Sequence, residues 1–477
     1  MLGIAQAPDT LWTKLYGRSG PDRAYAIEPA SDSGYIIAGA TFTPNPICNY
    51  DIYLIKINEQ GDTVWTKVLG GQYNDGARCL RCTSDGGYII TGYSQPGTTH
   101  EDVYLVKIDD SGNTVWAKTY GGAEDDCGYC VQQTDDGGYI IVGHMNINYR
   151  EDIYLLKTDS SGDTLWTRRY GGQFEDYGRA VIQTSDGGYM ILGYTDIAFG
   201  CQEYAIWLIR TDSIGDTLWT RTYSPYYYDE RGFAMQRTTD GGYVIAGCAL
   251  VSSHLWDLLV MKVDSAGDTL WKRISGGQDY EYGYSVAETH EGGYIVTGIR
   301  KPSPGDYDIY IERFDAFGNT AWSKVLGGTE DDESYAIIQT PDRGYLIAGY
   351  TESFGASNAD VYIIRLAPDS YGITELYKED LFACVDVSPN PFRNSTDIRY
   401  QITDDGCRTT DSRVLIRIFD ASGRLVKDLS QLSVISHQSS VKWDGTDSNN
   451  ARLSNGLYFL WLEVGEYTKM KKLLMIR

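Results

Sequence analysis

Seven acidic side chains recur at matched positions along the chain and could carry chemistry. The column comprises Asp22, Asp75, Asp126, Asp176, Glu230, Glu281 and Asp332. If these carboxylates meet at one mouth of the fold, they should raise one another's pKa values or recruit a hard cation such as calcium. The alternative is structural, with each carboxylate accepting hydrogen bonds from the backbone of its own loop.

An aromatic cluster is the second candidate, and it lies where one repeat departs from the others. The segment SPYYYDE stands where a Gly-Gly pair is the rule, so Tyr226, Tyr227 and Tyr228 should project beside His254 and Trp256 of the following loop. Aromatic faces beside acids suit sugar rings, because the rings give apolar contact while the acids accept hydroxyl hydrogen bonds. Alternatively, the tyrosines pack against a neighbouring repeat or domain.

Catalytic and metal motifs do not accompany these residues. The sequence contains no G-x-S-x-G, P-loop or H-E-x-x-H pattern, and its five histidines show no ligand spacing. The pairs Cys79/Cys82 and Cys127/Cys130 are poor zinc half-sites, because strand residues three apart point to opposite faces. A binding function is therefore favoured. A carbohydrate-active hydrolase or lyase is the alternative, if two column acids lie at working distance with unequal pKa values.

A repeat of about 51 residues must position these groups. Seven tryptophans mark it, at intervals of 50 to 53 residues: Trp12, Trp65, Trp116, Trp166, Trp219, Trp271 and Trp322. Each unit holds four short runs rich in Tyr, Ile, Val and Thr, separated by Gly and Asp turns, which is typical of four strands. Such a period with such content predicts the blades of an all-β, seven-bladed β-propeller over residues 9–368.

The two ends of the repeat array complement each other. The chain opens with DTLWTKLYG, a fourth strand without its first three, and the seventh unit ends after DVYIIRL without a Trp strand. We therefore expect the N-terminal strand to complete the last blade, which removes an exposed sheet edge. The segment 369–378 is a degenerate copy of the missing strand and could compete for this place.

Loop variability indicates which face binds. In propellers the loops from strand two to three and from strand four to the next strand one share a face. The strand two-to-three loops differ in every unit, and variable loops on a rigid scaffold commonly carry binding sites. A purely structural spacer role is a further alternative, and flat, uniformly polar loops would favour it.

The composition of the chain limits the classes of partner that it could bind. The 477 residues carry a formal net charge of -24, which repels nucleic acid, and no segment approaches the apolar length of a membrane span. Residues 1–8 fit the end of a signal peptide, with Ala5-Gln6-Ala7 as an A-x-A cleavage site.

The last ninety residues have the most specific motifs. The segments VSPNPFRNSTDIRYQI, LIRIFDASGRLVKDL, VKWDGTDSNNARLSNGLYFLWLEV and KMKKLLMIR resemble type IX secretion sorting domains and the Ig-like domain of flagellar hook-cap proteins. The repeats resemble those of large secreted proteins of Bacteroidetes-type bacteria. These resemblances imply a linker at 369–386 and an Ig-like sorting or anchoring domain at 387–477.

They also imply secretion or display on the outer surface of a bacterium, with the tail read by the secretion machinery. The expected function is accordingly a non-enzymatic module that binds a glycan or protein.

Overall fold

The computed structural model divides the chain into two compact units, Met1–Tyr371 and Gly372–Arg477. It describes residues 7–44, 48–95, 97, 100–147, 150–197, 203–223, 229–252, 255–302, 304–355, 358–369, 384–401, 414–420, 424–429, 438–464 and 467–476. All regular elements in these ranges are strands. No helix among them is long and apolar enough to cross a membrane. The expected signal-peptide end falls mainly on residues 1–6, outside the described ranges.

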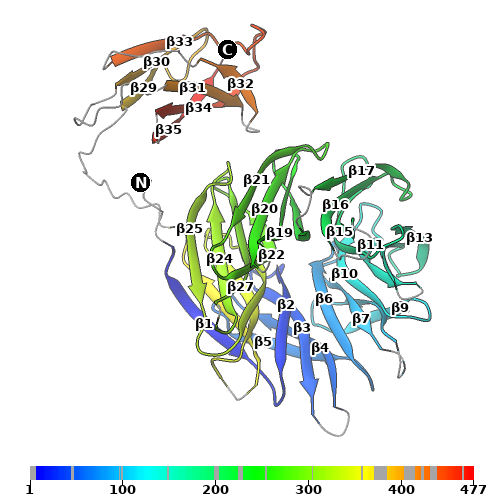
Figure 1. The fold of residues 1–477 in the computed structure, drawn as a ribbon. Helices are drawn as coiled ribbons and strands as arrows, with labels where there is room; N and C mark the ends of the chain where they lie inside the picture. Colours follow the sequence, from blue (N-terminus) through cyan, green and yellow to red (C-terminus); the bar gives the residue numbers. More distant parts are fainter. Residues whose placement is uncertain are drawn as a thin grey trace. The chain divides into compact units, whose positions relative to one another are not determined.

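Unit 1 is built from seven four-stranded antiparallel sheets (Figure 1). The first three comprise β2 (Asp22–Pro29), β3 (Tyr35–Thr43), β4 (Asn49–Ile57), β5 (Thr63–Leu69); β6 (Asp75–Cys82), β7 (Tyr88–Ser94), β8 (Asp102–Ile108), β9 (Thr114–Tyr120); and β10 (Asp126–Gln133), β11 (Tyr139–Asn146), β12 (Glu151–Thr158), β13 (Thr164–Tyr170).

The next three comprise β14 (Asp176–Gln183), β15 (Tyr189–Asp196), β16 (Tyr204–Thr211), β17 (Thr217–Tyr223); β18 (Glu230–Arg237), β19 (Tyr243–Ser252), β20 (Leu255–Val263), β21 (Thr269–Ser275); and β22 (Tyr280–Glu288), β23 (Tyr294–Lys301), β24 (Asp308–Phe314), β25 (Thr320–Leu326). The last sheet joins β26 (Asp332–Gln339), β27 (Tyr345–Thr351) and β28 (Asp360–Leu366) to β1 (Thr10–Tyr16).

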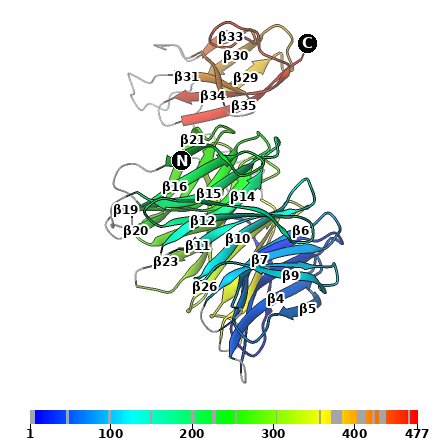
Figure 2. The same cartoon turned by 90° about the vertical axis from the view of Figure 1, so that its right-hand side faces the viewer.

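The first strand of each sheet contacts the first strand of the next, and β26 of the last sheet also contacts β2 of the first. Figures 1 and 2 show the sheets following one another side by side. β1 pairs antiparallel with β28, with Trp12 opposite Arg365. The fold of unit 1 is therefore propeller-like.

Unit 2 has two antiparallel sheets. One contains β29 (Cys384–Ser388), β30 (Thr396–Gln401) and β33 (Gln438–Trp443); the other contains β31 (Val414–Asp420), β32 (Leu425–Asp428), β34 (Gly456–Val464) and β35 (Tyr467–Met475). Ile398 and Trp443 of the first sheet share a buried core with Ile416 and Leu460 of the second. Burial of these side chains from both sheets stabilises the unit.

Basic residues of the third strands fix the turns between strands one and two. The Lys157 ammonium is 2.9 Å from Asp136, and Lys107 is likewise 2.9 Å from Asp85. Both lysine side chains are almost fully buried, so their charges require these partners. These ion pairs give the lysines of the third strands a structural role in the hairpin turns.

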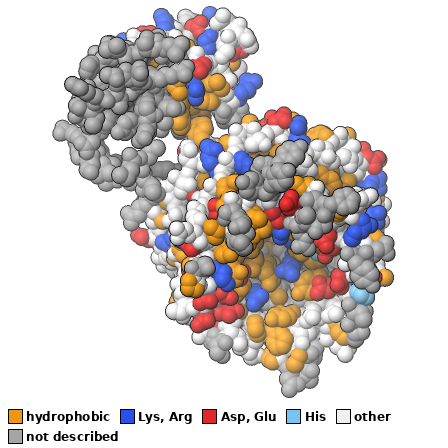
Figure 3. All heavy atoms as spheres, in the orientation of Figure 1, with side chains coloured by type: hydrophobic (Ala, Val, Ile, Leu, Met, Phe, Trp, Pro, Cys, Tyr) orange, Lys and Arg blue, Asp and Glu red, His pale blue; other side chains and the backbone are white. Residues whose placement is uncertain are grey.

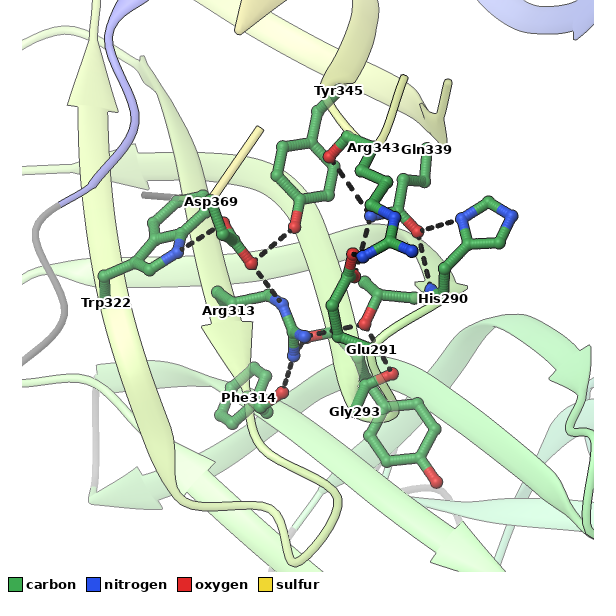
Figure 4. Close-up of polar contacts among 12 residues, drawn as sticks. His290, Glu291, Gly293, Arg313, Phe314, Trp322, Gln339, Arg343, Tyr345 and Asp369 are labelled. Carbon is green, nitrogen blue, oxygen red and sulfur yellow. Dashed lines mark hydrogen bonds and ion pairs between the residues drawn. The ribbon is translucent and has the colours of Figure 1, made fainter. Parts of the chain in front are cut away.

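In the sixth sheet the acidic residue of the turn between strands one and two is Glu291. The basic residue of the third strand, Arg313, pairs instead with Asp369 (Figure 4). Asp369 accepts hydrogen bonds from Trp322 Nε1 at 2.9 Å and Tyr345 Oη at 2.8 Å, and it pairs with Arg313 Nε at 3.2 Å. Asp369, which the sequence assigns to the linker, is thus bound to unit 1.

We expect Asp369→Ala to lower the free energy of unfolding by about 3 kcal/mol or more, because it leaves the buried Arg313 guanidinium without its carboxylate. The control is Arg343→Ala. Arg343 lies 3.5 Å from Glu291 with 65% of its side chain exposed, so its loss should cost less than about 1 kcal/mol. Denaturant unfolding of both variants provides the comparison, and equal losses would contradict the assignment.

Candidate functional site

The acidic column lies at the start of the first strand of each sheet: six of its members are the first residue of their strand, and Glu281 is the second residue of β22. Five of its members accept a backbone hydrogen bond from the loop that precedes the strand; Gly122 N donates to Asp126 Oδ2 at 2.8 Å, and Gly172 N to Asp176 Oδ2 at 3.0 Å. The other three acceptors are Asp22, Asp75 and Asp332. These bonds match the structural alternative stated above.

The two glutamates of the column have basic partners instead. Lys272 Nζ lies 2.6 Å from Glu230, and Arg300 Nε lies 3.5 Å from Glu281. Within the described ranges, no three His, Cys, Asp or Glu side chains are grouped so that they could hold a metal ion. The calcium ring therefore stays a prediction.

A second acidic column supplies the charges that crowd the first. It consists of the aspartates near the start of the third strands: Asp51, Asp102, Asp152, Asp257, Asp308 and Asp360. The pair Asp102 and Asp126 flanks Gly121, where a Cβ would stand only 2.1 Å from one carboxylate and 2.7 Å from the other. Burial first, and then the neighbouring charge of Asp102, raises the pKa of Asp126 to about 6.

Glu281 is also buried near a second carboxylate. Its raised pKa predicts that the stability of the folded chain depends on pH. Burial and the charge of Asp257 raise the pKa of Glu281 to about 7, from an ordinary value of 4.5. Between these values the folded chain holds a proton that the unfolded chain has released, so the free energy of unfolding falls as pH rises. We expect Glu281→Gln to reduce the drop in melting temperature between pH 5 and pH 8. An undiminished drop would show that Glu281 does not titrate in this window.

A ring of large side chains accompanies a β-bulge that recurs in every first strand. The register shifts once in each strand, and the skipped residue is large. We call these seven the bulge ring: Tyr25, Arg78, Tyr129, Arg179, Phe233, Tyr284 and Tyr335. Each is only partly buried, so the ring borders solvent-accessible space. Bulges re-aim side chains and are frequent at functional sites.

Most neighbouring members of the bulge ring are in contact. The ring centroids of Tyr25 and Tyr335 are 5.0 Å apart, those of Tyr335 and Tyr284 are 5.2 Å apart, and those of Tyr284 and Phe233 are 5.6 Å apart. The remaining contacts involve guanidinium groups over aromatic faces. Arg78 lies 5.0 Å from Tyr25, and Arg179 lies 4.1 Å from Tyr129. Such contacts are cation–π interactions.

Trp256, which the sequence proposes as a ligand contact, joins this ring through stacked aromatics. Its ring stacks on Tyr282 at 6.0 Å, and Tyr282 stacks on Tyr284 at 6.1 Å. The Arg231 guanidinium lies 4.9 Å from Trp256 and is held by Asp229 at 2.8 Å. In Figure 3 the visible face of unit 1 is hollowed near its middle, where hydrophobic and basic side chains gather.

The other members of the proposed aromatic cluster lie outside the described residues. These are Tyr226, Tyr227, Tyr228 and His254. Their role in binding stays a prediction. Sequence reasoning missed the bulge ring, although a signal exists: each of its members directly precedes a column of small residues such as Ala26 and Cys130.

Comparison with known proteins identifies the family to which the C-terminal unit is similar. Residues 386–476 match the family model of the secretion system C-terminal sorting domain. A curated relative, regulatory protein FlaEY of Caulobacter vibrioides, is 29% identical over 111 residues, which is 20% of this chain and 12% of that protein. The chain thus spans about an eighth of the length of this relative.

Solved structures give only distant likenesses. PorZ of the Porphyromonas gingivalis type IX secretion system is 13% identical, with a TM-score of 0.41 over 97% of this chain and 59% of that one. A puromycin hydrolase is 14% identical, with a TM-score of 0.48 over 83% and 61%. Scores this low support no inference about activity. The family match and its four motifs show that residues 386–476 are a type IX secretion sorting domain, and that the chain is exported to the outer surface or surroundings of a bacterium.

Proposed function

We propose that the chain is a secreted, non-enzymatic binding module that holds a glycan or protein on the variable-loop face of a seven-bladed β-propeller. In this proposal residues 9–368 form the ring, β1 closes it, residues 369–386 link it to the tail, and residues 387–477 form an Ig-like sorting domain. The contact between β26 and β2 and the contact between Tyr335 and Tyr25 of the bulge ring support seven blades around one axis.

The observation that carries the binding proposal is the aromatic and guanidinium cluster around Trp256. Trp256, Tyr282 and Tyr284 form a continuous stack, and Arg231 lies over both Trp256 and Tyr204. Trp256 stands at the start of β20, directly after a variable strand two-to-three loop, and is partly exposed. Aromatic and arginine side chains are the residues that most often dominate binding energies.

The column acids favour binding over hydrolysis or lyase chemistry. A catalytic pair must face an open substrate and carry one protonated and one ionised carboxyl group. Asp75 and Asp332 are instead buried under their own loops, and each accepts a backbone hydrogen bond there. Their positions are explained by loop structure alone.

Arrays of glycans and of surface proteins, probed with the full chain, test the proposal. We expect Trp256→Ala to weaken capture of any ligand by about tenfold or more, because it removes the central aromatic contact. Joint replacement of Tyr226, Tyr227 and Tyr228 by alanine should also weaken it. The control is Ile214→Ala, an exposed apolar residue in a strand three-to-four hairpin. Unchanged binding in the aromatic variants would discard this site.

A further inference from the structure

Two guanidinium groups of the bulge ring, those of Arg78 and Arg179, have no counterion among the residues that the structure describes. Two arginines outside the bulge ring differ in this respect: Arg23 pairs with the carboxylate of Glu352, and Arg231 pairs with that of Asp229. Within the described residues Arg78 and Arg179 form no ion pair, and the Nε atom of each is buried without a hydrogen-bond partner. Arg179 donates a hydrogen bond to Tyr194 Oη at 2.6 Å. Buried charge without a counterion is costly, so a site of this kind is suited to an incoming anion.

The guanidinium groups of Arg78 and Arg179 both lie near Tyr129 and His144. The Arg179 guanidinium lies over Tyr129, and Arg78 interacts electrostatically with the same tyrosine. The ring centroid of His144 is 5.4 Å from that of Tyr129, so the pKa of His144 depends on the charges near this tyrosine. Burial, followed by the charges of Arg179 and Arg78, lowers the pKa of His144 to about 4. The charges of Arg78 and Arg179 thus act together on His144, whose Nε2 atom also lies 3.8 Å from the carboxylate of Glu151.

The surroundings indicate what carries the anion. Tyr335, Tyr284 and Tyr282 present stacked aromatic faces that continue from this region to Trp256. Sugar rings stack on such faces, and a carboxylate makes paired hydrogen bonds with a guanidinium. A flexible acidic peptide would use the guanidinium groups but has no comparable need for the aromatic faces.

We propose that Arg78 and Arg179 receive the carboxylate of an acidic sugar residue, a uronate or a sialate, whose ring stacks on the tyrosines of the bulge ring. This inference rests on the binding function proposed above and specifies its ligand class. It makes the guanidinium pair the charge-selective part of the site, and Trp256 the apolar part nearer the variable loops.

The experiment is calorimetric titration of the full chain with galacturonate, glucuronate and sialyl oligosaccharides, each beside its carboxyl-reduced, neutral counterpart. We expect an acidic form to bind and its neutral counterpart to bind at least about tenfold more weakly. This comparison needs no variant. Equal binding of the two forms, or no binding of any acidic form, overturns the inference.

Variants then locate the contact. Arg179→Gln should weaken acidic binding by about 10- to 100-fold without affecting neutral ligands, and Arg179→Lys should restore part of it. Arg168→Gln makes the same charge change at a partly exposed position on β13, outside the bulge ring, and should have no effect. Melting temperatures verify folding, and Arg78→Gln replaces any variant that unfolds.

The outcomes separate this inference from the function on which it rests. Acidic-sugar binding that survives Arg78→Gln and Arg179→Gln but is lost in Trp256→Ala would refute the guanidinium site and leave the binding module standing. An oligoglutamate peptide that binds as tightly as the sugars, with the same dependence on Arg179, would refute the sugar assignment.

Discussion

Gly143→Ala is expected to lower the free energy of unfolding of unit 1 by about 3 kcal/mol or more. Gly143 on β11 stands opposite the bulge of β10, where a Cβ would lie 1.8 Å from the carbonyl oxygen of Cys127. Because the obstacle is backbone, relief requires moving the bulge that places Tyr129. Denaturant unfolding measures the loss, and aromatic near-ultraviolet circular dichroism measures the change in the bulge ring.

Gly172→Ala is the matched control. Nothing stands within 4 Å of its ideal Cβ, and Ala keeps the N–H that donates to Asp176. We expect this variant to stay within about 0.5 kcal/mol of the parent chain. If Gly143→Ala is as mild, the first strands can shift without cost and the close approach at the bulge is not a constraint.

Deletion of residues 387–477 should abolish export. The family match assigns this segment to secretion, and a sorting domain acts as an address that the machinery must recognise. We expect the truncated chain to accumulate inside the cell and its surface and extracellular fractions to disappear. Immunoblots of fractionated cells, with protease treatment of intact cells, provide the measurement.

The control for the deletion keeps the domain and changes an exposed contact. Arg424 on the tail is 73% exposed and pairs with Asp420 across four residues, so Arg424→Ala should leave export unchanged. Truncated chain that still reaches the surface would contradict the assignment of the tail as the signal.

Most of the strand framework was predictable from local residue patterns. The seven tryptophans lie on fourth strands, and the opening segment with Trp12 pairs with β28 as expected. These predictions succeeded because alternating apolar residues and Gly turns are local signals. The acidic residues were assigned to loops but begin strands, since Asp126 and its equivalents cap the loop while their own backbone enters the sheet.

The candidate site was only partly predictable. Trp256 stood out because it breaks a repeat, and its described contacts with Tyr282 and Arg231 fit a binding role. Tyr129 and Arg179 were overlooked because a bulge shifts the two-residue alternation by one, so that a large residue beside a small one does not reveal where it points. Contacts between different sheets are not encoded in the pattern of any single strand.

The pairing of β1 with β28 has a consequence for how the protein is made. β1 leaves the ribosome before the other strands of unit 1, yet its partner is not synthesised until the rest of the repeat array has followed. Such a distant contact is slow to form, and until then the last sheet presents an open edge to other chains. We therefore expect nascent or prematurely terminated chains to depend on chaperones, and β1 to be among the last strands of unit 1 to fold.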